Sequence, residues 1–166
     1  MNRGIVVNSV AALALGICCC AAPTCAQTAK DVVGTWTMVA NVTEQDGKKT
    51  EPFGTNPKGI MVLDGSGHYV VVSMRATLPK FASNNRVAGT PEENAGVVQG
   101  SITHFGTYSV NEADKTLLFK IENSTFANWN GAEQKRPFTL TGDELTYTIP
   151  TSSVGGTARV VWKRVK

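Results

Sequence analysis

Short β-rich segments recur along the chain, separated by turn signals. Eight can be drawn, at residues 33–43, 59–64, 68–76, 101–110, 115–123, 135–140, 144–149 and 157–165. Such runs, rich in Val, Ile, Thr and aromatic residues and bounded by Gly, Pro and Asn, are typical of an all-β sandwich or barrel. The segments therefore predict an all-β fold with eight strands.

The connections between these segments alternate in length. Those after the second, fourth and sixth are tight, at residues 65–67, 111–114 and 142–143. Those after the first, third, fifth and seventh are longer or richer in Gly and Pro, at residues 44–58, 77–100, 124–134 and 150–156. In an up-and-down arrangement, all tight turns share one end of the molecule. The pattern predicts an eight-stranded antiparallel up-and-down barrel with one tight end and one open end. The alternative is a sandwich whose loop lengths happen to alternate.

One short helix is predicted between strands 3 and 4. The sequence Thr90-Pro91-Glu92-Glu93 places a hydroxyl cap before a proline at the first helical position. A glutamate three residues after the cap completes a capping box, in which side chains satisfy free backbone N–H groups. We expect the helix to run over residues 91–99.

The first 26 residues have the layout of a secretory signal peptide. A basic start is followed by an apolar run at residues 10–22, and small residues lead to a cleavage site after Ala26. The run is shorter than the roughly 20 residues of a membrane-spanning helix. We therefore expect an exported protein, periplasmic or secreted, whose mature domain is residues 27–166. The four cysteines all lie in the leader, which predicts a mature chain without disulfides.

Composition narrows the classes of partner. The formal net charge is only +3, and no basic cluster is dense enough to indicate nucleic-acid binding. No later stretch is long and apolar enough to span a membrane. With two histidines, His68 and His104, lacking metal-ligand spacing, we expect neither a metal nor another cofactor. Oligomeric state is not indicated.

We expect the first and last predicted strands to pair with each other and so close the barrel. Gly34 and Trp36 begin the first strand, and Trp162 and Arg164 end the last one. Closing an eight-stranded up-and-down sheet pairs these strands at the tight end. We expect Trp36 to fill that end with Arg164 over its ring, a cation–π contact contributing about 0.5 to 2 kcal/mol. The alternative is that Trp36 is an ordinary core residue and Arg164 is solvated.

Several segments in this order resemble the bacterial lipocalin-like domain family, a calycin-type β-barrel. They are GTW, PFGTNPKGIM, LPKFASNN, GTPEEN, GSITHFGTYSV and STFANWNG, and the resemblance covers residues 33–165. It implies a small barrel with an internal cavity and, by analogy, a carrier of small, largely apolar molecules. The missing disulfide and the mid-chain helix depart from typical secreted lipocalins.

Candidate ligand contacts lie inside the barrel and at its open end. Alternation places His104 and Tyr108 on one face of their strand and Phe119 on the apolar face of the next. If both faces point inward, His104 and Tyr108 are polar groups in an otherwise apolar cavity, which is the usual form of a ligand site. On the third strand, Val70, Val72 and Met74 form the default inward face, and Tyr69, Val71, Ser73 and Arg75 the other. Either an inward Arg75 or Arg136 would suit a ligand carboxylate.

The long loops add apolar candidates at the open end. They are Phe81, beside the predicted helix, and Phe126 and Trp129 in the loop at residues 124–134. The alternative for Phe126 and Trp129 is a minor core at the rim of the barrel.

A binding protein is the favoured function, and an enzyme is the alternative. No nucleophile motif is present, which gives hydrolase or metal chemistry little support. His104 and Tyr108 in one cavity would suit proton transfer, as in a small-molecule isomerase.

Overall fold

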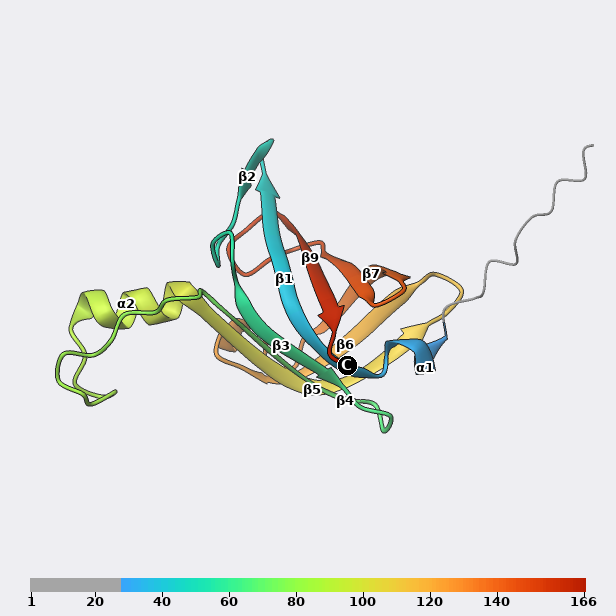
Figure 1. Ribbon diagram of the computed structural model, residues 1–166, viewed down its shortest axis with the longest axis horizontal. Helices are drawn as coiled ribbons and strands as arrows, with labels where there is room; N and C mark the ends of the chain where they lie inside the picture. Colours follow the sequence, from blue (N-terminus) through green and yellow to red (C-terminus); the bar gives the residue numbers. More distant parts are fainter. Residues whose placement is uncertain (1–27) are drawn as a thin grey trace, which may run out of the picture.

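Antiparallel strands wind into a closed barrel in this computed structural model, which describes residues 28–166 (Figure 1). The predicted signal peptide at residues 1–26 lies outside the described residues. The strands are β1 (Gly34–Gln45), β2 (Lys48–Thr50), β3 (Lys58–Leu63), β4 (His68–Met74), β5 (Ser101–Asn111), β6 (Thr116–Ser124), β7 (Glu133–Thr141), β8 (Glu144–Ile149) and β9 (Thr157–Arg164). The helical elements are α1 (Ala29–Val32), α2 (Pro91–Gly100) and the 3₁₀ turn η1 (Ala127–Trp129).

Eight strands form the barrel, as predicted, and β2 is an addition to it. Each barrel strand pairs antiparallel with the next, and β1 pairs with β9 to close the sheet. The short β2 folds back on the end of β1 across Asp46-Gly47, both with positive φ. Asp-Gly is a preferred two-residue hairpin turn because glycine adopts that conformation without steric cost. The segment was not predicted because its side chains are all polar and exposed.

The predicted position of the helix, between strands 3 and 4, does not match the strand count of the structure, although its residues, 91–99, and the strand segments on either side of it are as predicted. With β2 present, α2 follows β4 and leads directly into β5. Its capping box is as expected: the Glu93 backbone N–H donates to the Thr90 hydroxyl at 3.2 Å, and the Thr90 N–H donates to the Glu93 carboxylate at 2.8 Å. Figure 1 shows α2 and its preceding loop extending sideways from the barrel.

The tight end of the barrel is closed around Trp36. Its ring is fully buried, its Nε1–H donates to the Val32 carbonyl at 3.0 Å, and the Arg164 guanidinium lies 4.1 Å above the ring centroid. Arg164 also donates to the backbone carbonyls of Val33 and Asp31 at the end of α1. A Cβ at Gly34 would lie 2.6 Å from Arg164 Nη1, so a larger residue there would displace this guanidinium. Trp162 is buried in the same core and pairs with Met38 of β1.

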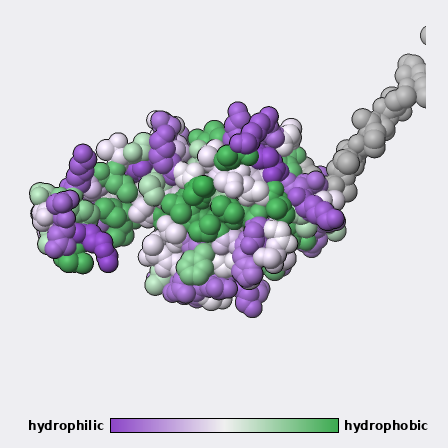
Figure 2. Space-filling view, turned by 60° about the horizontal axis from the view of Figure 1, so that its bottom comes forward, coloured by the Kyte–Doolittle hydropathy of each residue, from purple (hydrophilic) through white to green (hydrophobic). Residues whose placement is uncertain are grey.

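The inward face of β4 differs from the default prediction. Tyr69, Val71 and Ser73 are buried, whereas Val70, Val72 and Met74 are only half-buried. The outer surface here is itself apolar, because the register sets Val70 beside Phe105 of β5 and Val72 beside Ile60 of β3. Figure 2 shows hydrophobic side chains gathered at the centre of one face of the molecule. Hydrophobicity alone therefore could not distinguish the two faces of β4.

Candidate functional site

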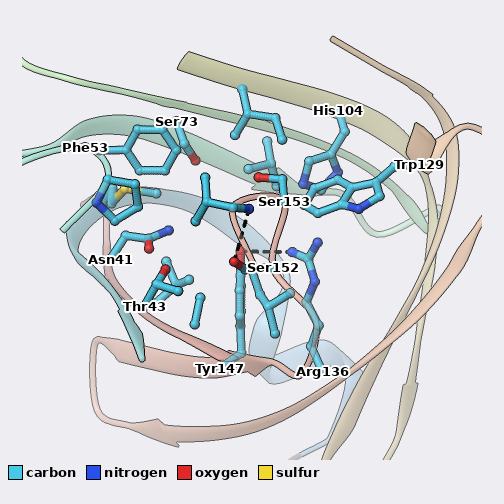
Figure 3. Close-up of a pocket in the computed structure, with 18 residues that line it drawn as sticks. Asn41, Thr43, Phe53, Ser73, His104, Trp129, Arg136, Tyr147, Ser152 and Ser153 are labelled. Atoms are coloured by element: carbon cyan, nitrogen blue, oxygen red, sulfur yellow. Dashed lines mark hydrogen bonds between the residues drawn. The ribbon is translucent and has the colours of Figure 1, made fainter. Parts of the chain in front are cut away.

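A small cavity lined by both apolar and polar side chains lies inside the barrel below its open end. Its volume is about 40 Å³. Polar side chains from β1, β4, β5, β7 and β8 line it: Asn41, Thr43, Ser73, His104, Arg136 and Tyr147 (Figure 3). A single water needs about 10 to 15 Å³ measured in this way, so the interior has room for a few waters or one small polar group.

Arg136 on β7 is the charged group of this cavity. Strand alternation buries Arg136 and Phe138 and exposes Lys135 and Pro137, so the guanidinium points inward with no exposed surface. Its Nη1 donates to the Tyr147 hydroxyl at 3.1 Å, and its Nη2 donates to Gln134 Oε1 at 2.6 Å.

The guanidinium of Arg136 also packs between two aromatic rings. It lies 4.5 Å from the centroid of Phe119 and 5.0 Å from that of Tyr147. Its Nε–H is buried without an acceptor, and no Asp or Glu among residues 28–166 forms an ion pair with it. Burying a charge without a counter-ion costs several kcal/mol even after relaxation. Cation–π contacts offset only part of that cost.

His104 on β5 stands in the same interior, paired with a tyrosine from the neighbouring strand. The Tyr69 hydroxyl and His104 Nδ1 are 2.9 Å apart, and the histidine is 2% exposed. Burial, followed by the nearby charge of Arg136, holds the pKa of His104 well below its ordinary value. Burial also raises the pKa of the Tyr69 phenol. Both groups are therefore uncharged at neutral pH, which leaves Arg136 as the charge of this cluster.

Trp129 covers His104 from the open end. Trp129 is the last residue of η1, and Phe126 precedes the first. The Trp129 backbone N–H donates to the Phe126 carbonyl at 3.0 Å. The indole packs edge-to-face on the imidazole at 5.7 Å between centroids and on Phe126 at the same separation. Aromatic pairs in this geometry contribute about 0.5 to 1.5 kcal/mol beyond their buried area.

A larger apolar hollow forms the mouth of the barrel. Its volume is about 400 Å³, within the range of pockets that hold small molecules. Apolar side chains from α2, β5 and three loops line it: Phe53, Val97, Val98, Ile102, Phe126 and Val154. Mouth and interior are adjacent, since both are lined by Pro52, Phe53, Ile102, Ser153 and Val154.

A family model described as a lipocalin-like domain matches residues 33–165. The chain belongs to this lipocalin-like domain family. The match spans every strand of the barrel, from β1 to β9. A search of curated proteins finds no match. None of the helices in residues 28–166 is long and apolar enough to cross a membrane.

Four predicted ligand-contact residues meet inside this lipocalin-like barrel. His104, Phe119 and Arg136 are buried together, with Trp129 covering His104. Phe126 lies at the mouth.

Four others are not brought to the cavity. Met74 points to the outer side of β4, and Arg75, beyond the end of that strand, is exposed and donates its Nε–H to the Pro52 carbonyl at 3.0 Å. Phe81 packs in its own loop, where a Cβ on Gly89 would collide with its ring. Tyr108 lies toward the tight end, with its hydroxyl donating to the Asp64 carbonyl at 2.7 Å. Met74 was misplaced because both faces of β4 are apolar, whereas a strand end or a loop path sets the positions of the other three.

Several interior residues of this lipocalin-like barrel escaped the sequence analysis. Tyr147 was available from alternation, since Leu145, Tyr147 and Ile149 share the inward side of β8. Asn41 and Thr43 gave no signal, because polar residues on a half-exposed strand are expected to face water. Their side-chain oxygens are buried in the cavity without a hydrogen-bond partner in the described chain.

Proposed function

We propose that this lipocalin-like barrel binds a small, largely apolar molecule at its open end. The observation that carries this proposal is the apolar mouth of about 400 Å³, which lies directly beside a small interior cavity that holds several polar side chains. A pocket that is mostly apolar with a few convergent polar groups is the usual form of a small-molecule site. The interior is too small for a whole ligand, so the body of the ligand occupies the mouth and its polar end enters the barrel.

Exposed valines at the mouth support this assignment. Val98 is 76% exposed and Val154 is 56% exposed, although both line a concave surface. Covering a Val side chain with an apolar group gains about 1.5 kcal/mol or more. A ligand spanning the two would therefore be held chiefly by the hydrophobic effect.

The protein is further proposed to act outside the cytoplasm. The support is the sequence of residues 1–26, with its apolar run and the cleavage site after Ala26. Export to the periplasm or beyond would bring the barrel to ligands of that compartment. The mass of the protein recovered from a bacterial periplasm tests this, since cleavage after Ala26 leaves a chain beginning at Gln27.

Binding of a neutral apolar dye tests the site. N-phenyl-1-naphthylamine should gain fluorescence with the wild-type protein and quench Trp129, which stands between mouth and interior. Val154→Asp should weaken dye binding at least tenfold, because it places a carboxylate against the apolar ligand. Val87→Asp is the matched control, since Val87 is exposed on the loop before α2 and does not line the mouth.

Two results would contradict the proposal. One is a wild-type protein that gives no fluorescence gain with the dye. The other is equal weakening by Val154→Asp and Val87→Asp. Trp129→Phe locates the site more closely, because it should reduce the quenching while leaving the dye affinity nearly unchanged.

A proton-transfer enzyme is the second candidate, and one observation favours it. His104 is a neutral base hydrogen-bonded to the Tyr69 phenol, with the charge of Arg136 nearby to stabilise a developing anion. Any small molecule co-purified with the protein serves as the substrate to test. Its conversion to an isomer by wild type but not by Tyr69→Phe, followed by chromatography, would support this function. Unaltered ligand after incubation with wild type would exclude it for that compound.

A further inference from the structure

Arg136 is placed where a ligand's polar end would arrive. The guanidinium lines the interior cavity, and that cavity shares part of its wall with the mouth. Figure 3 shows Arg136 and Tyr147 on one side of the cavity, with Asn41 and Thr43 across from them. All of these groups are polar, but only Arg136 carries a charge.

The Arg136 guanidinium has more N–H donors than its hydrogen bonds to the described residues use. A guanidinium has five N–H donors in a fixed plane and no acceptor. Tyr147 and Gln134 accept one bond each, from Nη1 and Nη2 respectively. The Nε–H remains buried without an acceptor in residues 28–166. With one bond each from Nη1 and Nη2, three of the five N–H donors have no hydrogen bond to a described residue and could donate to an added oxygen.

The surroundings do not supply the missing negative charge. The groups that contact Arg136 are an amide, a phenol and two aromatic ring faces, and none of them is a carboxylate. The described chain therefore contributes a buried cation with no counter-ion. A cation in this position attracts an anion more strongly than an exposed one would, because little water lies between them.

From this geometry we infer that the ligand is an apolar monocarboxylate, with its carboxylate on Arg136 and its hydrocarbon body in the mouth. This inference rests on the proposed function and names the class of molecule that the same site takes. A single buried cation balances one negative charge. The interior of about 40 Å³ suits a group as small as a carboxylate.

A matched pair of probes tests the inference. Decanoate and decanol have the same chain length and differ in the charge of the head group. Titration calorimetry on the wild-type protein at pH 7.5, below the micellar range, should give a Kd for decanoate at least tenfold lower than that for decanol. Decanol should still bind, since the mouth holds the chain in both cases.

Arginine variants locate the effect. Arg136→Met, which removes the charge at similar length, should bring the two affinities to within about twofold by weakening decanoate alone. Arg159→Met is the matched control, because Arg159 is an exposed arginine of β9 whose guanidinium reaches Thr146, and it should keep the full preference. If Arg136→Met does not fold, Arg136→Lys keeps the charge and should retain a preference for the acid.

Each outcome bears on one statement. Equal wild-type affinities for decanoate and decanol would overturn the carboxylate inference and leave the proposed binding function standing. An acid preference that survives in Arg136→Met would also overturn it, because the charge that attracts the acid would lie elsewhere. If neither decanol, decanoate nor the neutral dye binds, the proposed function fails and the inference fails with it.

Discussion

His104 and Arg136 illustrate how burial changes what a residue does. On a surface, histidine titrates near neutral pH and arginine pairs with the nearest carboxylate. In this barrel the histidine is held neutral while the arginine keeps its charge without a counter-ion. Both effects arise from surrounding side chains of other strands.

The lowered pKa of His104 predicts a pH-dependent stability. Below about pH 6.5 the unfolded ring takes up a proton that the folded ring does not, so stability falls as pH falls through that value. The groups facing His104 are Tyr69 and Arg136, and neither changes charge in this range. Between pH 7 and pH 5.5 the wild type should lose about 1 kcal/mol more unfolding free energy than His104→Gln.

Urea unfolding at the two pH values measures this difference. A His104→Gln variant with the same pH dependence as wild type would show that the folded ring takes up the proton normally.

At the scale of the element, β5 and β6 depend on one glycine. The strands change register between Phe105 and Gly106, and Gly106 is buried in the bulge. A Cβ at this position would collide with the backbone carbonyl of Lys120 on β6. On one side of this bulge β5 carries His104 into the barrel. On the other side it carries Tyr108, whose hydroxyl bonds to the Asp64 carbonyl at the tight end.

Gly106→Ala should therefore destabilise the barrel by about 1 to 3 kcal/mol, the usual range for overpacking. Gly65→Ala is the matched control, since an added Cβ at this turn meets no atom within 4 Å. Urea unfolding compares the two variants. A loss below about 0.5 kcal/mol in Gly106→Ala would mean that β5 and β6 separate without cost.

At the scale of the whole molecule, closure of the barrel joins the two ends of the domain. Residues 31–36 and Arg164 are far apart in sequence, yet Arg164 binds the carbonyls of Asp31 and Val33 and covers Trp36. An unpaired first or last strand would leave an open sheet edge. Closure removes that edge and the backbone groups it would expose.

Trp36→Ala should consequently lower the unfolding free energy by about 3 to 5 kcal/mol, as for other large buried truncations. Val39→Ala serves as the control, because Val39 is 48% exposed on the same strand and should change stability by less than about 0.5 kcal/mol. Urea unfolding at pH 7 measures both. A loss below about 1 kcal/mol for Trp36→Ala would show that closure does not depend on this ring.

The sequence by itself determined the barrel and its two unequal ends. Alternating turn lengths, the capping box at Thr90 and the Gly34-Thr35-Trp36 start are local signals, written in neighbouring residues. Such signals report backbone preferences, and these need no tertiary contact to act. Strand alternation was also enough to place His104 and Phe119 on faces that could turn inward.

Only the tertiary structure decided which of these side chains share a cavity. Both sides of β4 are apolar, so packing against β5 and β3, rather than hydrophobicity, turned Tyr69 inward to meet His104 and left Met74 outside. The course of β5 toward the tight end sets the position of Tyr108, and the path of the loop between β4 and α2 sets that of Phe81. That Arg136 finds no carboxylate among residues 28–166 is likewise a property of the assembled barrel, because a counter-ion is a neighbour in space that no spacing in the chain reveals.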